Sequence, residues 1–181
     1  MIRAHRCRRP AGTSGFTLLE VLIALVVLAF GLLSLARGIG RASQEEMEAW
    51  QRSQGMLLAQ EMADRIGNNQ KQAALYVGEY IPAAAAEDCS AAPSQVARDA
   101  CEWRNRLLGD DVRDGDATIG APLGARGCVT NPAPNVYMIA VAWQGVVPTE
   151  APDSGCGAGA FDHEENRRVF STVLQIATLG A

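Results

Sequence analysis

The pattern of apolar and polar positions divides the chain near residue 40. Residues 16–36 are mostly apolar and carry a single charge, Glu20, and about 20 predominantly apolar residues are enough to span a bilayer core as a helix. Before this segment lie fifteen residues that include four arginines and no acidic residue. After it, apolar and polar residues are mixed as in an ordinary globular chain. The pattern predicts one membrane-spanning helix followed by a polar domain.

Helical character continues beyond the membrane segment. Residues 41–66 contain no proline, and Gly67, Asn68 and Asn69 then form a helix stop signal. We expect one helix over residues 16–67, about 75 Å long at 1.5 Å per residue. Its second half should pack one face on a head domain, through apolar residues that recur at helical spacing. These are Met47, Trp50, Leu57, Leu58, Met62 and Ile66.

Three glycines, Gly31, Gly38 and Gly40, interrupt this predicted helix. Each weakens a helix by roughly 1 kcal/mol relative to alanine. One interpretation is a segment that bends or melts when the protein joins a filament. The other is close packing between membrane helices, where small residues are common. The sequence leaves both open.

The charges orient the chain and exclude one class of partner. The chain has a formal net charge of −4, and from Phe16 onward it has 12 basic and 20 acidic residues, a difference of −8. We expect such an acidic domain to be a poor nucleic-acid binder, because phosphate contacts need clustered lysine and arginine. Basic residues next to a membrane segment stay cytoplasmic. The N-terminus is therefore expected inside, and the head outside, in the periplasm. The leader arginines are Arg3, Arg6, Arg8 and Arg9.

The cysteines fit an oxidising compartment for the head. Cys7 lies in the leader, and four more cysteines lie on the outer side of the membrane segment. Four cysteines suggest two disulfides, with three possible connectivities, against the alternative of free buried thiols. We expect Cys89–Cys101, which closes a small loop, and Cys128–Cys156, which holds a glycine-rich segment to a sheet.

The small residues before the apolar segment differ from an ordinary signal peptide, where they follow it. A cut at Gly15 keeps the helix in the mature chain; the alternative is an uncut anchor. Residues 15–20, Gly-Phe-Thr-Leu-Leu-Glu, resemble the class III signal of type IV prepilins and secretion pseudopilins. The resemblance implies that prepilin peptidase cleaves between Gly15 and Phe16 and methylates the new amine of Phe16. Residues 1–15 are then a leader peptide, and residues 68–181 the head.

Glu20 is a candidate for a role in assembly. A carboxylate inside a membrane helix costs roughly 2.5–3.5 kcal/mol on insertion scales, so it is a functional candidate by default. Glu20 lies four residues after Phe16, on the same helix face. In a helix bundle its carboxylate would pair with the amine of a neighbouring subunit. The alternative is a carboxylate that reaches the headgroup level.

A narrower resemblance covers the second half of the helix. Residues 52–69 and Tyr76 are similar to the PilV group of minor pilins, the type IV pilus modification proteins. This resemblance implies a minor pilin that helps to prime assembly of a type IV pilus. Its implied partners are other minor pilins, the major pilin and a tip adhesin. The second candidate is a minor pseudopilin of type II secretion, which shares the leader and the helix.

The remaining sequence predicts an α+β head with the type IV pilin-like fold. Residues 81–97 are rich in alanine and proline and predict a loop, and residues 98–108 predict a short helix. Strands are expected over residues 126–130, 136–144 and 168–178, the first two joined by a hairpin connection at residues 131–135. Antiparallel strands covering one face of a long helix give this fold class.

No pattern in the head indicates an active site, a cofactor or a metal. The acidic run does not match a calcium loop. His163 lacks nearby ligands of the same kind, and Gly157 and Gly159 lack the lysine of a phosphate loop. We therefore expect a structural protein rather than an enzyme; a membrane-anchored periplasmic enzyme would need a catalytic cluster. The tryptophans are expected in the core. The acidic run consists of Asp110, Asp111, Asp114 and Asp116, and the tryptophans are Trp50, Trp103 and Trp143.

Overall fold

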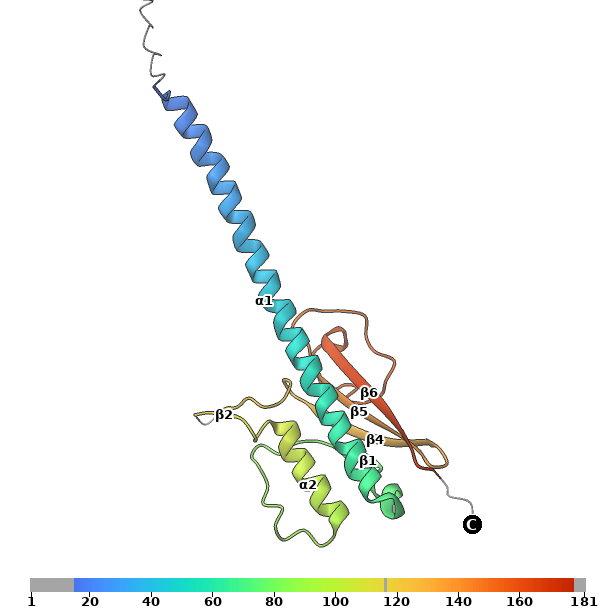
Figure 1. The fold of residues 1–181 in the computed structure, drawn as a ribbon. Coiled ribbons are helices and arrows are strands. Elements are labelled where there is room, and N and C mark those ends of the chain that lie inside the picture. Colours follow the sequence, from blue (N-terminus) through green and yellow to red (C-terminus); the bar gives the residue numbers. More distant parts are fainter. Residues whose placement is uncertain (1–14, 116, 178–181) are drawn as a thin grey trace, which may run out of the picture. The chain divides into compact units, whose positions relative to one another are not determined.

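The computed structural model describes residues 15–115 and 117–177, with the elements named in Figure 1. The chain divides into two compact units, and the boundary in the sequence falls between Ala42 and Ser43. In chain order the elements are α1 (Leu18–Asn68), η1 (Gln70–Tyr76), β1 (Gly78–Tyr80), α2 (Gln95–Leu108), β2 (Arg113–Asp114), β3 (Ala117–Thr118), β4 (Arg126–Ala133), β5 (Val136–Gln144), η2 (Glu164–Asn166) and β6 (Arg167–Gln175).

The first half of α1 has no core of its own. Its apolar side chains are exposed throughout, from Leu18 to Ile39. Within the described residues, α1 is the one helix long and apolar enough to cross a membrane, and none of its apolar window is buried. The helix runs without a break through Gly31, Gly38 and Gly40, and a Cβ added at any of them would meet nothing within 4 Å outside the helix's own backbone and the adjacent residues.

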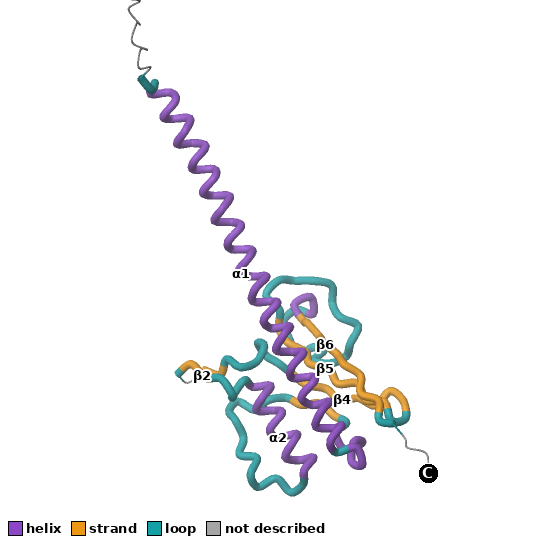
Figure 2. The backbone as a smooth tube through the Cα atoms, in the orientation of Figure 1, coloured by secondary structure: helices purple, strands orange, loops and turns teal. Residues whose placement is uncertain are grey.

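The head contains a four-stranded antiparallel sheet in the order β1-β4-β5-β6. The second half of α1 packs on one face of this sheet, and α2 lies beside α1 (Figure 2). The predicted α+β class, a long apolar helix packed on a small antiparallel sheet, is confirmed. The central strand β5 is buried on both faces, because a loop covers the side opposite α1.

The packing face of α1 differs in part from the predicted one. Leu58, Met62 and Ile66 are buried, as expected. Met47, Trp50 and Leu57 are exposed, and Trp50 keeps 40% of its surface. The buried stripe begins at Gln51 and uses small residues, since Gly55, Ala59 and Ala63 let the sheet approach closely. A Cβ at Gly55 would lie 2.7 Å from the ring of Trp143. The packing face of α1 was therefore predicted only in part, because the prediction relied on large apolar residues alone.

The second helix begins earlier than predicted because it has its own cap. The hydroxyl of Ser94 accepts a hydrogen bond from the backbone N–H of Ala97 at 3.2 Å, so α2 starts at Gln95. Gly109 ends the helix in the left-handed conformation, with φ of 85°. Residues 95–97, expected in a loop, are therefore helical.

The strands also extend differently from the prediction. β4 continues to Ala133, so the expected five-residue connection is a two-residue turn at residues 134–135, with Asn135 at φ 60°. The pairing register shifts between Thr130 and Ala133. β1 and the small β2-β3 hairpin were not predicted, because two or three residues are too few to show a period.

Trp103 forms the centre of the contact between the two helices and the sheet. Its side chain is fully buried, its indole N–H donates to the carbonyl of Leu58 at 2.9 Å, and its ring meets that of Tyr80 edge-on at 4.9 Å between centroids. Under the ring lies Gly127 of β4, where a Cβ would clash with the indole and lie 3.0 Å from Leu107. The absence of a side chain at this position lets α2 close on the sheet.

We expect Gly127→Ala to lower the free energy of unfolding of the head by about 1–3 kcal/mol, because the added methyl group overpacks a rigid ring. The matched control is Gly155→Ala, where a Cβ meets nothing within 4 Å. Urea unfolding of the purified full chain in detergent, followed by tryptophan fluorescence, measures both. Equal stability of the two variants would contradict this description of the core.

Candidate functional site

The start of α1 is organised by Thr17. Its hydroxyl accepts a hydrogen bond from the backbone N–H of Glu20 at 3.3 Å, and its carbonyl accepts one from Val21. Thr17 therefore occupies the capping position, and Thr17 with Glu20 has the spacing of a capping box. This role was not predicted from the sequence, although the Thr-x-x-Glu pattern signals it. It also explains why the helix begins at Leu18 rather than at Phe16.

Glu20 lies in the first turn of α1, where the helix dipole favours a negative charge. Its side chain is exposed, and no ion pair involving it is present among residues 15–115 and 117–177. Phe16 lies four residues earlier and is 82% exposed. The structure thus places both predicted residues at one end of an uncovered apolar helix. The carboxylate is available to a group on another molecule. Residues 1–14 of the predicted leader lie outside the described residues.

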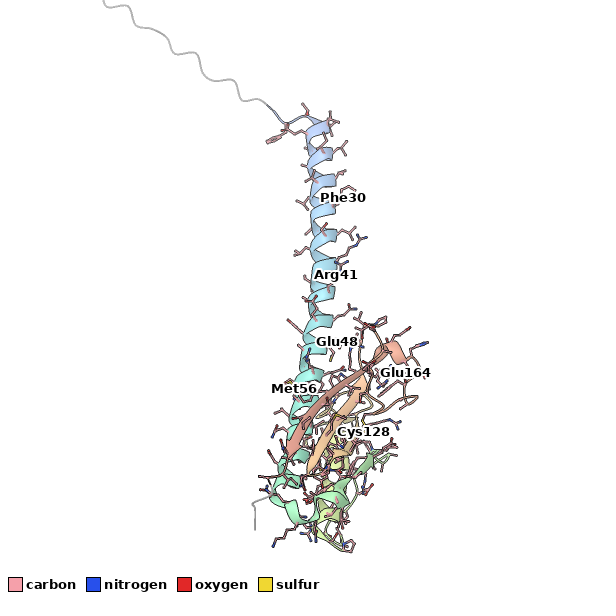
Figure 3. The ribbon with its side chains drawn as sticks, turned by 90° about the vertical axis from the view of Figure 1, so that its right-hand side faces the viewer. Phe30, Arg41, Glu48, Met56, Cys128 and Glu164 are labelled. Carbon is pink, nitrogen blue, oxygen red and sulfur yellow. A yellow bond between two sulfur atoms is a disulfide. The ribbon has the colours of Figure 1, made fainter. Side chains whose placement is uncertain are left out.

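The two pairs of cysteines are joined in the head. Cys89 and Cys101 form a disulfide with their Cα atoms 5.7 Å apart, which ties the loop after β1 to α2. Cys128 and Cys156 form the second, at 5.8 Å between Cα atoms. This second bridge holds the loop before β6 against the face of the sheet opposite α1, beside Ala140 and Ala142. Figure 3 marks Cys128 on the sheet.

A buried arginine positions the same loop. The Arg167 guanidinium is 4% exposed and donates to the carbonyl oxygens of Pro152 and Cys156, each at 3.0 Å, and of Ser154 at 2.5 Å. It also pairs with Glu164 at 2.6 Å. Three carbonyls and one carboxylate satisfy the buried donors. The loop therefore has a fixed shape, in which the disulfide is one of two anchors.

A polar network joins the end of α1 to α2. Asp99 is 4% exposed and accepts hydrogen bonds from Arg65, Tyr76 and Gln95. Arg65 also pairs with Glu61 and Glu102. Burial raises the pKa of Tyr76 to about 12, and its hydrogen bond to Asp99 adds to the shift. Arg65 and Tyr76 thus both hold the end of α1 and η1 to α2.

The other residues considered for chemistry do not converge. Among the described residues, no three His, Cys, Asp or Glu side chains lie close enough to hold a metal ion. Asp110 pairs with Arg113, and Asp111 with Arg106. His163 precedes η2 and is exposed.

The head has a mainly apolar groove of about 1140 Å³. Trp50 and Met47 of α1 line one side of it, and Ile119 and Leu123 line the other. Trp50 was expected in the core, and that expectation was wrong; Trp103 and Trp143 are buried as expected.

Comparison with known proteins gives one match. A family model described as the prokaryotic N-terminal methylation motif matches residues 11–36. This match, over 26 of the 181 residues, indicates a type IV pilin-like or pseudopilin protein, a class of structural proteins. It implies processing by prepilin peptidase and assembly with other pilins in a membrane system. The described fold is consistent with that of pilins. No curated protein and no solved structure matches the chain.

We expect both disulfides in the exported protein. Peptide mapping without reduction should recover Cys89 linked to Cys101 and Cys128 linked to Cys156. Replacing either pair by serine should lower the free energy of unfolding by about 2–4 kcal/mol, because the open chain regains conformational entropy. Recovery of Cys89 linked to Cys128 or Cys156 would contradict the pairing.

Proposed function

We propose that this chain is a minor pilin of a type IV pilus, similar to the PilV group. Prepilin peptidase cuts between Gly15 and Phe16 and methylates Phe16. The mature chain is held in the inner membrane by α1, with its head in the periplasm, and then enters the pilus. The observation that carries the proposal is the methylation motif over residues 11–36, joined to an apolar helix that continues into an α+β head.

Glu20 supplies specificity to this assembly. Lipid tails are as apolar as leucine side chains, so apolar contacts alone give little preference for one helix stagger over another. Cleavage leaves a cationic amine on Phe16. A bond between that amine and the Glu20 carboxylate of a neighbouring helix satisfies both charges in one register only. A buried ion pair of this kind adds little net stability but specifies alignment.

The role as a minor pilin rests on the resemblance of residues 52–69. The proposed partners are other minor pilins, the major pilin and a tip adhesin, in a complex that primes assembly. Within this stretch, Leu58, Met62 and Ile66 pack into the head, and Arg65 anchors α2. The resembling residues therefore support a shared way of mounting the head, and the exposed surfaces are left to select partners.

The second candidate is a minor pseudopilin of type II secretion. The methylation motif favours it equally, because pilins and pseudopilins share that motif. Deletion of the gene separates the two. Loss of surface pili with normal protein secretion supports the pilus, whereas loss of secretion with normal pili supports the pseudopilin.

We expect Glu20→Val to be processed and to accumulate in the membrane, but to be depleted at least tenfold from sheared pili. Removal of the charge lowers the cost of insertion, while the proposed contact with Phe16 is lost. The matched control is Ser34→Val. The Ser34 hydroxyl donates to the carbonyl of Phe30 at 2.9 Å within its own helix, so it needs no partner.

Immunoblots of membranes and of sheared pili measure this difference. Entry of Glu20→Val into pili at the level of Ser34→Val and of the native chain would refute the pairing. Failure of Glu20→Val to be processed would assign Glu20 to recognition by the peptidase instead.

A further inference from the structure

The head part of α1 carries a second stripe of residues beside the one that packs on the sheet. The buried stripe runs from Gln51 to Ile66. The second stripe repeats at alternating intervals of three and four residues, which is the spacing of a coiled-coil seam. None of its residues is buried, and Leu57 keeps 61% of its surface. We name it the outer stripe, and it consists of Met47, Trp50, Gln54, Leu57, Glu61 and Asp64.

The outer stripe lines two hollows that lie next to each other in the head. Its first two residues line the apolar groove beside Trp50, and its last four line a smaller hollow of about 380 Å³. Ile119 lines the groove and Gly120 lines the smaller hollow, so the two continue along the same opposite wall. All of these residues belong to the unit that begins at Ser43. An exposed apolar groove of this kind is typical of a binding site for another molecule.

The groove also contains a polar group that the head leaves unpaired. Gln51 lines the groove and is 4% exposed. Its buried side-chain oxygen has no hydrogen-bond partner within the described part of the chain. A buried acceptor without a partner lowers stability, so an apolar residue would suit the isolated head better. The amide fits a donor that a bound partner supplies, once a change of side-chain rotamer opens the oxygen to it.

The charge of the outer stripe changes along its length. Its first four residues are uncharged, and the last two, Glu61 and Asp64, are carboxylates. Arg106 pairs with Glu61 and with Asp111, which lines the same hollow. Asp64 has no ion pair among residues 15–115 and 117–177. Three carboxylates therefore line the smaller hollow with one guanidinium, and this end of the stripe is acidic.

Two copies of the chain do not pair through their outer stripes. The stripe contains no basic residue, so no arrangement of two stripes, parallel or antiparallel, gives its carboxylates a partner of opposite charge. Glu61 and Asp64 of one copy would meet either the same carboxylates, which repel them, or apolar residues, which leave them desolvated. The apolar half of α1 from a second copy is the remaining alternative, and a mapped cross-link separates it from a different protein.

We propose that the outer stripe of α1 receives an α-helix of a different protein. That helix has apolar residues opposite Met47, Trp50 and Leu57, and lysine or arginine opposite Glu61 and Asp64. Trp50 and Glu61 are about 16 Å apart along α1 at 1.5 Å per residue, so about three helical turns separate the two kinds of residue in the partner. Apolar contacts supply the affinity, and the charges select the partner and its orientation. The proposal holds for a pilus and for a secretion pseudopilus alike.

The test combines a cross-linker with reversal of one charge. A photo-reactive phenylalanine derivative replaces Leu57 in the full chain in its own cells, and mass spectrometry maps the adduct. The matched control position is Met56, an exposed neighbour on α1 that lines neither hollow. Asp64→Lys reverses the charge at the acidic end. Glu45→Lys makes the same change at an exposed residue of α1 outside both hollows.

We expect an adduct at residue 57 with a helical segment of another protein that contains lysine or arginine. Asp64→Lys should lower its yield at least tenfold while both disulfides still form, and Glu45→Lys should leave it unchanged. Replacing the partner's basic residue by glutamate should restore the adduct in the Asp64→Lys chain, because the charge pair is then reversed. If Asp64→Lys does not accumulate, Trp50→Ala removes an apolar contact in its place and should lower the yield as strongly.

An adduct with any part of a second copy, an adduct insensitive to both Asp64→Lys and Trp50→Ala, or a yield at residue 57 no higher than at residue 56 would each overturn the proposal. Absence of the chain from sheared pili counts against the proposed function instead, and leaves the cross-linking result to decide the outer stripe.

Discussion

An apolar helix surface that the chain itself does not cover constrains the whole molecule. From Leu18 to Ile39 the large side chains of α1 are exposed, and in water this surface would cost about 25 cal/mol for each Å². The segment therefore needs lipid or the helices of other subunits. A helix that is stable in either environment can move from one to the other at little cost, and this exchange is what a filament assembled from a membrane requires.

The head is mounted on the remainder of the same helix. Leu58, Met62 and Ile66 of α1 belong to the core of the head, and Trp103 reaches across to the carbonyl of Leu58. The Asp99 network and the two disulfides fix α2 and the loop before β6 around that core. The second half of α1 cannot leave the sheet without exposing these residues. The surfaces left for partners are then the apolar groove beside Trp50, the edge of β6 and the exposed loops.

Hydrophobic pattern predicted the long helix and the central strand, because both are long enough to show a period. The ends of α1 fell within two residues of the prediction, since Gly67 and Asn68 are strong stop signals. The packing face was partly wrong, because Gly55, Ala59 and Ala63 contribute through their small size, which a count of apolar residues does not register. Local capping by Thr17 and Ser94 was readable in the sequence but was missed.

The position of β6 at the edge of the sheet could not be predicted from the sequence. Whether a strand lies at an edge depends on sheet order, which arises from pairing between distant segments and leaves no local signal. The need for glycine at position 127 also leaves no local signal, because it arises from contact with the ring of Trp103, which is distant in the sequence. Glu20, by contrast, could be identified as a candidate from the sequence alone, because a lone carboxylate in an apolar membrane segment is costly. Its proposed partner, the amine of Phe16, lies on another molecule, so one chain does not contain the complete proposed site.

The central claim is that the chain is cut before its apolar helix and keeps that helix as a filament element. Mass spectrometry of the intact chain and of its N-terminal peptide, purified from membranes and from sheared pili, tests this most directly. The account predicts a mature chain that begins at Phe16 and carries one methyl group on its amine. A chain that retains residues 1–15 in cells with active prepilin peptidase, or one that is cut after the apolar segment, would contradict it.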